Sequence, residues 1–281
     1  PSAPPSTPPP CGSVAAMTYP YEDRFAIVRG MPDEGRPRDE ILADVRWMGE
    51  QEDRSWNQGH CSGTMYCGDV EHYAFLNQVF AAFSHVNALQ RDICPSITKF
   101  EAEITAMTLD LFHGEAAEDP CGSITGGGTD SILTAMLVYR DQAKAERGIT
   151  APNFIMPTTA HPAFDKAGHL FGIEVRKAPI NPETTLVDVD WVADHIDADT
   201  VALVGSAGNY PYGTIDDIAA LSDLAVEHGI GLHVDGCLGG FILPWGQQLG
   251  IDIPVFDFRL PGVTTISADT HKYGYGLKGT S

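Results

Sequence analysis

The stretch TVALVGSAGNYPYGTIDDIAALSDLAVEHGIGLHVDG (residues 200–236) decides the fold class. Its two ends, TVALVGSAG (200–208) and GIGLHVDG (229–236), are short apolar runs that indicate buried strands. Between them, IDDIAALSDLAVEHG (215–229) has the apolar spacing of a helix and ends in glycine. A strand, a helix and a second strand in succession predict two parallel strands joined by a helical crossover.

The same alternation extends along the chain from Cys121 onward. Further short strands are expected at 153–157, 172–180 and 262–269, and a long helix at 129–148. Strands separated by helices predict an α/β fold with a mostly parallel, helix-flanked sheet.

The first 120 residues have a different texture. The leader 1–30 opens with PSAPPSTPPP, which cannot build a core and is expected to be disordered. Residues 31–120 are expected to form an N-terminal helical and extended segment, with helices at 38–53, 70–84 and 99–113 and a glycine-rich loop at 57–69. Residues 121–281 are expected to form the large domain.

Composition excludes several classes of partner. Asp and Glu number 38 against 17 Lys and Arg, a formal charge of −21, which argues against nucleic acid and anionic membranes. No apolar run approaches the roughly 20 residues that a membrane span needs. The six cysteines form no CxxC pair, which indicates reduced thiols in a cytoplasmic protein instead of a disulfide framework.

Four motifs follow predicted strands or precede a helix. They are GSITGGGTD (122–130), HPAFDKAG (161–168), HVDG (233–236) and SADTHKYG (267–274). Ligands of open α/β sheets bind at the carboxyl ends of strands, so these motifs are expected to meet in one site.

The glycines of the first motif predict a phosphate cradle. They let the backbone approach a ligand, and the N–H groups and dipole at a helix start favour an anion. Nucleotide-binding alternatives do not match, because Gly128 stands where a P-loop needs lysine, and a GxGxxG motif would need glycine at Ser131. A simple turn into the helix is the alternative without a ligand.

The other motifs supply an acid and an amine. Asp235 ends a buried strand, where a carboxylate needs a partner such as a protonated ring nitrogen. A metal held by His233 and Asp235 would lack a third ligand, so no metal is expected and His233 is interpreted as structural. Of the six lysines, Lys272 and Lys278 have glycine-rich surroundings. Lys272 is the candidate for an imine, although an exposed loop lysine is the simpler alternative.

Together these parts are what a pyridoxal-phosphate (PLP) enzyme requires, with His161 or a nearby aromatic residue to stack on the ring. CSGTMYCGD (61–69), KFEAEI (99–104), GSITGGGTDSILTA (122–135), LHVDGCLGGF (232–241) and FDFRLPGVTTISADTHKYGYGLKG (256–279) resemble, in this order, the sphingosine-1-phosphate lyases. These belong to the group II PLP-dependent decarboxylase family. The resemblance implies the large domain of a fold-type I PLP enzyme.

The resemblance also implies roles for the cofactor-binding residues. Lys272 would form the Schiff base, Asp235 would pair with the pyridine nitrogen and His161 would stack on the ring. Gly128 and Thr129 would bind the cofactor phosphate, with His271 as a further phosphate contact. Gly279 and Thr280 would reach the cofactor of the neighbouring subunit, because the family is dimeric.

Three further positions match residues linked to substrate phosphate or to catalysis in the lyases. They are Tyr66, Tyr210, for which a catalytic role is expected, and Lys278. Loop packing is the alternative for both tyrosines, and a surface role for Lys278. The lyases carry a histidine near the site where this chain has Gln90, which cannot titrate.

The implied reaction is cleavage of a phosphorylated long-chain amino alcohol to an aldehyde and phosphoethanolamine. Amino-acid decarboxylation and an inactive PLP-fold scaffold are the alternatives. The chain ends nine residues after Lys272, so it is expected to be a fragment without the family's smaller C-terminal domain, and it shows no membrane anchor.

Overall fold

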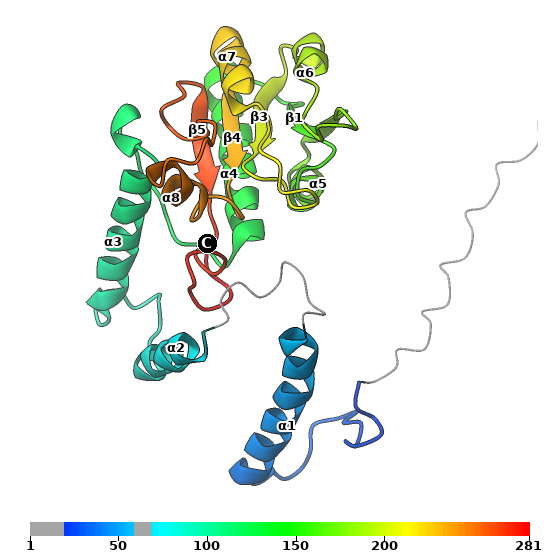
Figure 1. Ribbon diagram of the computed structural model, residues 1–281, viewed down its shortest axis with the longest axis vertical. Helices are drawn as coiled ribbons and strands as arrows, with labels where there is room; N and C mark the ends of the chain where they lie inside the picture. Colours follow the sequence, from blue (N-terminus) through cyan, green and yellow to red (C-terminus); the bar gives the residue numbers. More distant parts are fainter. Residues whose placement is uncertain (1–19, 59–68) are drawn as a thin grey trace, which may run out of the picture. The chain divides into compact units, whose positions relative to one another are not determined.

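The computed structural model describes residues 20–58 and 69–281 (Figure 1). The chain divides into two compact units, Pro1–Cys61 and Ser62–Ser281. In the first unit, helix α1 (Arg38–Asn57) carries Trp47, against which the rings of Tyr21 and Phe25 pack edge-on at 5.6 Å. The predicted leader 1–30 lies mostly outside the described residues, as does most of the predicted loop 57–69.

The second unit is built on a five-stranded, all-parallel sheet in the order β2-β1-β3-β4-β5 (Figure 1). The strands are β1 (Asn153–Pro157), β2 (Glu174–Ala178), β3 (Thr200–Ser206), β4 (Gly231–Asp235) and β5 (Val263–Ser267). The helices are α2 (Val70–Phe83), α3 (Pro95–Leu111), the 3₁₀ turn η1 (Gly114–Ala116), α4 (Gly128–Arg147), α5 (Ala163–Phe171), α6 (Val189–His195), α7 (Ile218–His228) and α8 (Leu243–Gln248). The predicted fold class is therefore confirmed.

Alternate residues of each strand enter two different hydrophobic clusters. Phe154 of β1 packs with α4 and α5, whereas its neighbour Ile155 packs in the cluster that contains α6 and α7. In β3, Val204 belongs to the cluster of Phe154, and Leu203 belongs to the cluster of Ile155. Side chains of successive strand residues point to opposite faces, so α4 with α5 and α6 with α7 cover opposite sides of the sheet.

Two helix starts differ from the sequence prediction for local reasons. Helix α3 begins at Pro95, four residues before the predicted start, because proline suits the first turn of a helix. Helix α7 begins at Ile218 because Asp217 caps it by accepting from Ala220 N. The preceding Asp216 turns inward and accepts from the backbone N–H groups of Ser206 and Val187.

The sheet brings the carboxyl ends of its strands to one edge. Ser206, Asp235 and Ser267 lie level with one another across β3, β4 and β5. Strands β2 and β3 lie on either side of β1. The connection after β1 therefore leads to one side of the sheet and the connection after β3 to the other. Open α/β sheets bind ligands at the point between two such connections. Of the predicted site residues, His161, Tyr210 and Lys272 follow strands β1, β3 and β5, and Asp235 ends β4.

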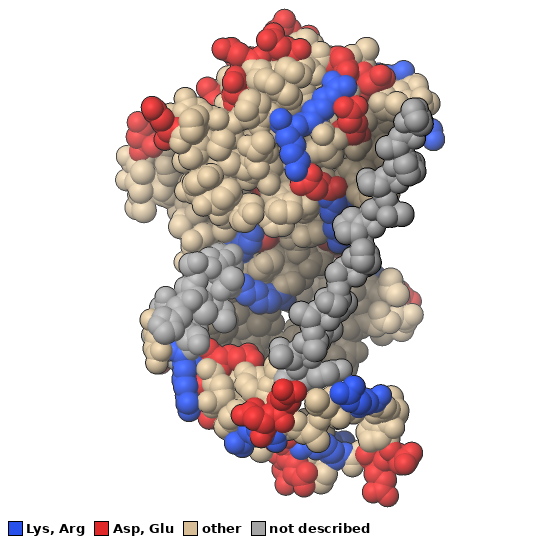
Figure 2. Space-filling model, turned by 90° about the vertical axis from the view of Figure 1, so that its right-hand side faces the viewer, with Lys and Arg blue, Asp and Glu red and all other residues tan. Residues whose placement is uncertain are grey.

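Part of the surplus of acidic side chains lies away from the predicted site. Acidic side chains gather at the upper end of the face in Figure 2, where α6 and α7 lie. Exposed Asp197 and Asp199 directly precede β3, so they lie at the amino ends of the strands, opposite the predicted cradle. Among the described helices, none is long and apolar enough to cross a membrane.

Candidate functional site

The start of α4 is shaped to receive an anion. Gly127 caps this helix with φ 138° and ψ 169°, a conformation that favours glycine, and no side chain caps the helix end. Within the described chain, no group accepts a hydrogen bond from the backbone N–H of Gly128 or Thr129. These N–H groups and the helix dipole fit the phosphate cradle predicted for Gly128 and Thr129.

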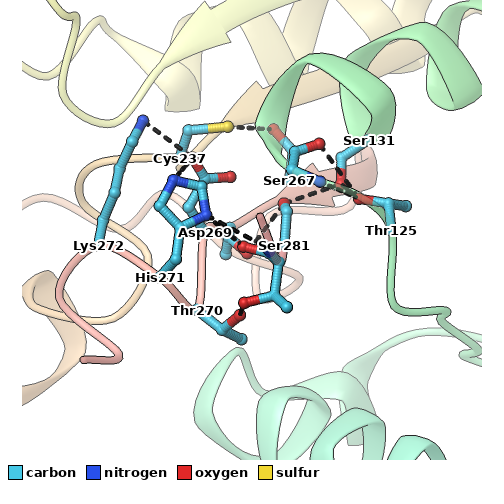
Figure 3. Close-up of polar contacts among 12 residues, drawn as sticks. Thr125, Ser131, Cys237, Ser267, Asp269, Thr270, His271, Lys272 and Ser281 are labelled. Atoms are coloured by element: carbon cyan, nitrogen blue, oxygen red, sulfur yellow. Dashed lines mark hydrogen bonds and ion pairs between the residues drawn. The ribbon is translucent and has the colours of Figure 1, made fainter. Parts of the chain in front are cut away.

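The end of the chain runs beside this cradle. Thr125 N donates to Ser281 O at 2.9 Å, and Ser281 N donates back to Thr125 O at 3.3 Å. Side chains add to this backbone pairing. Ser131 Oγ donates to Ser281 Oγ at 2.8 Å, and Ser281 Oγ donates to Ala268 O at 3.2 Å (Figure 3). Gly279, with φ 92°, and Thr280 therefore lie next to the cradle of their own chain.

Lys272 follows β5 in a tight turn. Its backbone N–H donates to Asp269 O at 3.1 Å, and its Nζ lies 2.9 Å from Asp269 Oδ2 (Figure 3). The Lys272 side chain is 17% exposed and that of Asp269 only 3%. The candidate amine is therefore held at the rim of a buried site.

His271 points to the cradle from the same turn. Its Nδ1 lies 2.6 Å from Thr280 O and 3.3 Å from Thr280 N, so the ring is held against Thr280. Its Nε2 lies 3.7 Å from Asp269 Oδ2. A Cβ atom placed on Gly127 would be 4.0 Å from His271 Cε1, which puts the imidazole beside the predicted phosphate position.

Asp235, the last residue of β4, is 7% exposed, and its Oδ1 accepts from Cys237 N at 3.0 Å. Burial raises the pKa of the Cys237 thiol well above its usual range, and the charges of Asp235 and Asp269 raise it further. The neighbouring His233 contacts the hydroxyls of Thr265 and Ser267 and is fully buried, which lowers its pKa to about 4. His233 is therefore neutral and structural, as interpreted from the sequence.

His161 and Tyr210 come together from the loops after β1 and β3. Their ring centroids lie 5.5 Å apart, edge to face. Ala163 N donates to His161 Nδ1 at 3.1 Å, so the neutral ring carries its proton on Nε2. Tyr210 as a whole is 57% exposed.

Lys278 shares a pocket of about 360 Å³ with His271 and Lys272. The walls of this pocket include the side chains of Phe80 and Leu277. Burial lowers the pKa of Lys278, and the charge of Lys272 lowers it further, so the two amines lie within electrostatic reach of each other.

One predicted substrate residue, Gln90, is not brought to this site. It is exposed in the loop between α2 and α3 and is not among the residues that line the pocket of Lys272 and Lys278. Tyr66 lies outside the described residues. The sequence reasoning, in turn, assigned no role to Asp269, although it stands inside the quoted motif SADTHKYG. The sequence feature that could have indicated a role is the spacing, because Asp269 is an acidic residue three positions before Lys272.

The residues present fit bound PLP. The start of α4 offers unpaired N–H donors, His271 and Lys272 lie beside it, and Asp235 offers a buried carboxylate at the end of the next strand. A Cβ on Gly128 would stand 2.6 Å from Asp269 Oδ1 and 2.8 Å from Cys237 Sγ, so this close packing needs glycine. No group of three possible metal-binding side chains occurs in the described part of the chain.

The model of the pyridoxal-dependent decarboxylase conserved domain matches residues 21–281. The chain belongs to the pyridoxal-dependent decarboxylase family. The predicted family, fold class and cofactor, PLP, are confirmed by this match.

Relatives divide between two activities. The chain is 43% identical to the sphingosine-1-phosphate lyase of Drosophila melanogaster over 251 residues, which are 89% of this chain and 46% of the fly protein. It is 37% identical to a probable L-aspartate decarboxylase of Pyrococcus furiosus over 243 residues, 86% of this chain and 62% of that protein. The chain thus spans about half the length of the lyases that it matches.

Solved structures agree. The sphingosine-1-phosphate lyase of Burkholderia pseudomallei is 60% identical, with a TM-score of 0.91 over 94% of this chain and 61% of that one. A glutamate decarboxylase of Lactobacillus brevis, 23% identical with a TM-score of 0.72 over 93% of this chain and 60% of that one, shows the shared fold alone.

Proposed function

We propose that this chain forms the cofactor-binding part of a PLP-dependent carbon–carbon lyase that cleaves a phosphorylated long-chain amino alcohol to an aldehyde and phosphoethanolamine. The observation that carries the proposal is the second lysine, Lys278, in one pocket with Lys272 and His271. Lys278 supplies a cation for a substrate phosphate next to the two residues that would hold the cofactor, and Phe80 and Leu277 suit an alkyl chain. The 60% identity to a sphingosine-1-phosphate lyase supports the same substrate class.

Bound PLP supplies a ring that withdraws the electron pair left when a bond to the substrate's Cα breaks. The chain supplies the surroundings. Asp235 would hold a proton on the ring nitrogen, and the start of α4 would hold the phosphate. Lys272 would be the amine that holds the cofactor until the substrate amine takes its place. Tyr210, an exposed residue whose ring contacts that of His161, would be available to move a proton to or from the reacting substrate.

Decarboxylation of an amino acid is the second candidate, because the chain is also 37% identical to a probable L-aspartate decarboxylase. The same cradle, lysine and aspartate would serve either reaction, and the substrate alone decides which bond breaks. An inactive scaffold would keep the fold without turnover.

One experiment separates these functions. The full-length protein is purified, its absorbance is checked for the yellow lysine–cofactor band, and it is incubated with phosphorylated sphingoid bases, L-aspartate, L-glutamate and aromatic amino acids. We expect long-chain aldehyde and phosphoethanolamine from the phosphorylated base alone. Release of CO₂ from an amino acid would favour the decarboxylase, and absence of any product with the cofactor bound would favour the scaffold.

The partner and the compartment are further proposals. A second copy of the protein is the proposed partner, because α2 and the loop after it expose large apolar side chains such as Phe75, Phe80, Leu89 and Ile93. The cytoplasm is the proposed compartment, because Cys94, Cys121 and Cys237 are free thiols.

A further inference from the structure

The turn after β5 places a second buried carboxylate in the site, besides Asp235. Asp269 is 2% exposed, and its Oδ2 lies 2.9 Å from Lys272 Nζ. The backbone hydrogen bond from Lys272 N to Asp269 O closes the turn, so the two side chains leave it on the same side. In Figure 3 a dashed line joins the end of the Lys272 side chain to Asp269.

The other carboxylate oxygen of Asp269, Oδ1, is closely packed but receives no hydrogen bond from the described residues. A Cβ on Gly128 would stand within 2.8 Å of both carboxylate oxygens, so the carboxylate is wedged against the first residue of α4. A buried carboxylate is costly unless a cation or donor compensates it, and Lys272 Nζ, at 2.9 Å from Oδ2, lies nearer than His271 Nε2, at 3.7 Å.

Other charged groups face the same place. His271 and Lys278 come from the same loop, Asp235 approaches from β4, and the buried thiol of Cys237 lies within electrostatic reach of both carboxylates. Helix α4 directs the positive end of its dipole here. The α2 residues that line the pocket, Tyr73, Asn77 and Phe80, carry no charge near neutral pH.

We propose that Asp269 is a positioning residue that holds the Lys272 amine as an ammonium ion beside the cradle whenever that amine is not bonded to the cofactor. The inference rests on the proposed role of Lys272. Only a free amine forms a C=N bond with an aldehyde, which loses its oxygen as water. The ammonium proton must therefore first pass to solvent, and Asp269 makes capture of the cofactor dependent on pH.

The test measures capture and not turnover. Full-length protein is freed of cofactor and mixed with PLP at a series of pH values, and the rate at which the coloured lysine–cofactor band appears is recorded. Pyridoxal, which lacks the titrating phosphate, is run in parallel. In Asp269→Asn, the pH of half-maximal capture rate should fall by about 1 to 3 units, since a nearby opposite charge favours the charged form by that amount.

Asp216→Asn is the matched control. Asp216 is another buried carboxylate, and it accepts from Ser206 N and Val187 N. Its loss should lower stability without moving the pH of capture. If Asp269 has only a structural role, its variant will behave like this control, and an unchanged capture profile in folded Asp269→Asn overturns the proposal.

A second measurement covers the case in which Asp269→Asn does not fold. In wild-type protein without cofactor, trace labelling with acetic anhydride is followed by peptide mapping at each pH. Lys272 should become reactive at a higher pH than Lys278, and the reverse order overturns the proposal. Borohydride reduction of the protein with bound cofactor distinguishes failure of the proposed cofactor site from failure of the role of Asp269 alone. A pyridoxyl group on another lysine sinks the proposed site itself, whereas a group on Lys272 with an unchanged capture profile sinks only the role of Asp269.

Discussion

Lys278 is the residue whose removal should separate phosphorylated from unphosphorylated substrates. A hydrogen bond to a charged group contributes roughly 1.5–3 kcal/mol, and about 1.4 kcal/mol corresponds to tenfold in affinity. Lys278→Ala should therefore lower kcat/KM by about 10- to 100-fold for a phosphorylated base and have little effect on a substrate without phosphate. Steady-state kinetics on both substrates measure this difference.

The control is Lys144→Ala, which removes the same charge from an exposed position on α4. It should leave both substrates unaffected. If Lys278→Ala loses activity equally on both substrates, Lys278 serves the structure or the cofactor, and the decarboxylase becomes the better proposal.

Gly128 is the second residue with a specific consequence. In Gly128→Ala, the new Cβ would meet the Asp269 carboxylate at 2.6 Å and Cys237 Sγ at 2.8 Å, and both groups are buried. Overpacking of this kind costs about 1–3 kcal/mol. Denaturant unfolding should show that loss, and the cofactor should dissociate faster because the start of α4 is displaced.

Gly126→Ala is the matched comparison for stability. Its Cβ would meet only Asp130 Oδ2, at an ordinary distance of 3.6 Å. Its free energy of unfolding should stay within about 0.5 kcal/mol of the wild type. Equal losses in the two variants would show that the close packing at Gly128 does not matter.

At the scale of elements, the contact between α4 and β4 depends on one glycine. A Cβ on Gly231 would stand 2.1 Å from Tyr139 Cε1. The ring cannot turn away easily, because the Tyr139 hydroxyl bonds to Thr264 and Thr265 at 2.7 and 2.6 Å. Gly231→Ala should lower the free energy of unfolding of the second unit by about 1–3 kcal/mol, measured in urea.

Gly49→Ala in α1 serves as its control, because no atom lies within 4 Å of the added Cβ and alanine favours a helix. The urea midpoint of the second unit should not change in that variant. An unchanged midpoint for Gly231→Ala as well would mean that α4 can move away from the sheet at little cost.

At the scale of the whole molecule, two buried groups give stability opposite dependences on pH. Burial raises the pKa of Asp216 to about 6, and the charge of Asp235 adds to the increase. The folded protein then binds this proton more tightly than the unfolded chain. The contribution of Asp216 to the free energy of unfolding is complete below about pH 4 and is lost as the pH rises through about 6.

His233 acts in the other direction. Burial lowers its pKa to about 4, so its contribution is complete above about pH 6.5 and is lost as the pH falls through about 4. In wild type the two effects oppose each other between about pH 4 and 6. Asp216→Asn removes one of them, so its free energy of unfolding should rise with pH more steeply than that of wild type.

Urea unfolding at intervals across this pH range measures both slopes. Asp217→Asn is the control, because Asp217 is the exposed N-cap of α7 and asparagine caps a helix equally well. Its stability should follow the wild-type pH profile. Identical slopes for Asp216→Asn and wild type would contradict the assignment of Asp216.

The local parts of this molecule were readable from the sequence. Short apolar runs predicted the strands and helical spacing predicted most of the long helices, because these patterns reflect how each element is buried. The glycines before α4, Asp235 at the end of β4 and Lys272 after β5 were found for the same reason. Each stands next to the element that positions it, so neighbouring residues carry the signal.

Only the tertiary structure decided what lies across from these residues. The strand order β2-β1-β3-β4-β5 brings His161 to Tyr210, and Ser281 pairs with Thr125 from the far end of the domain. Spacing along the chain carries no information about such partners. The short turn made a contact between Asp269 and Lys272 possible, but α4 closes over that carboxylate and makes it buried. Burial is the result of packing between distant elements, and it determines how strongly a carboxylate holds a neighbouring ammonium ion.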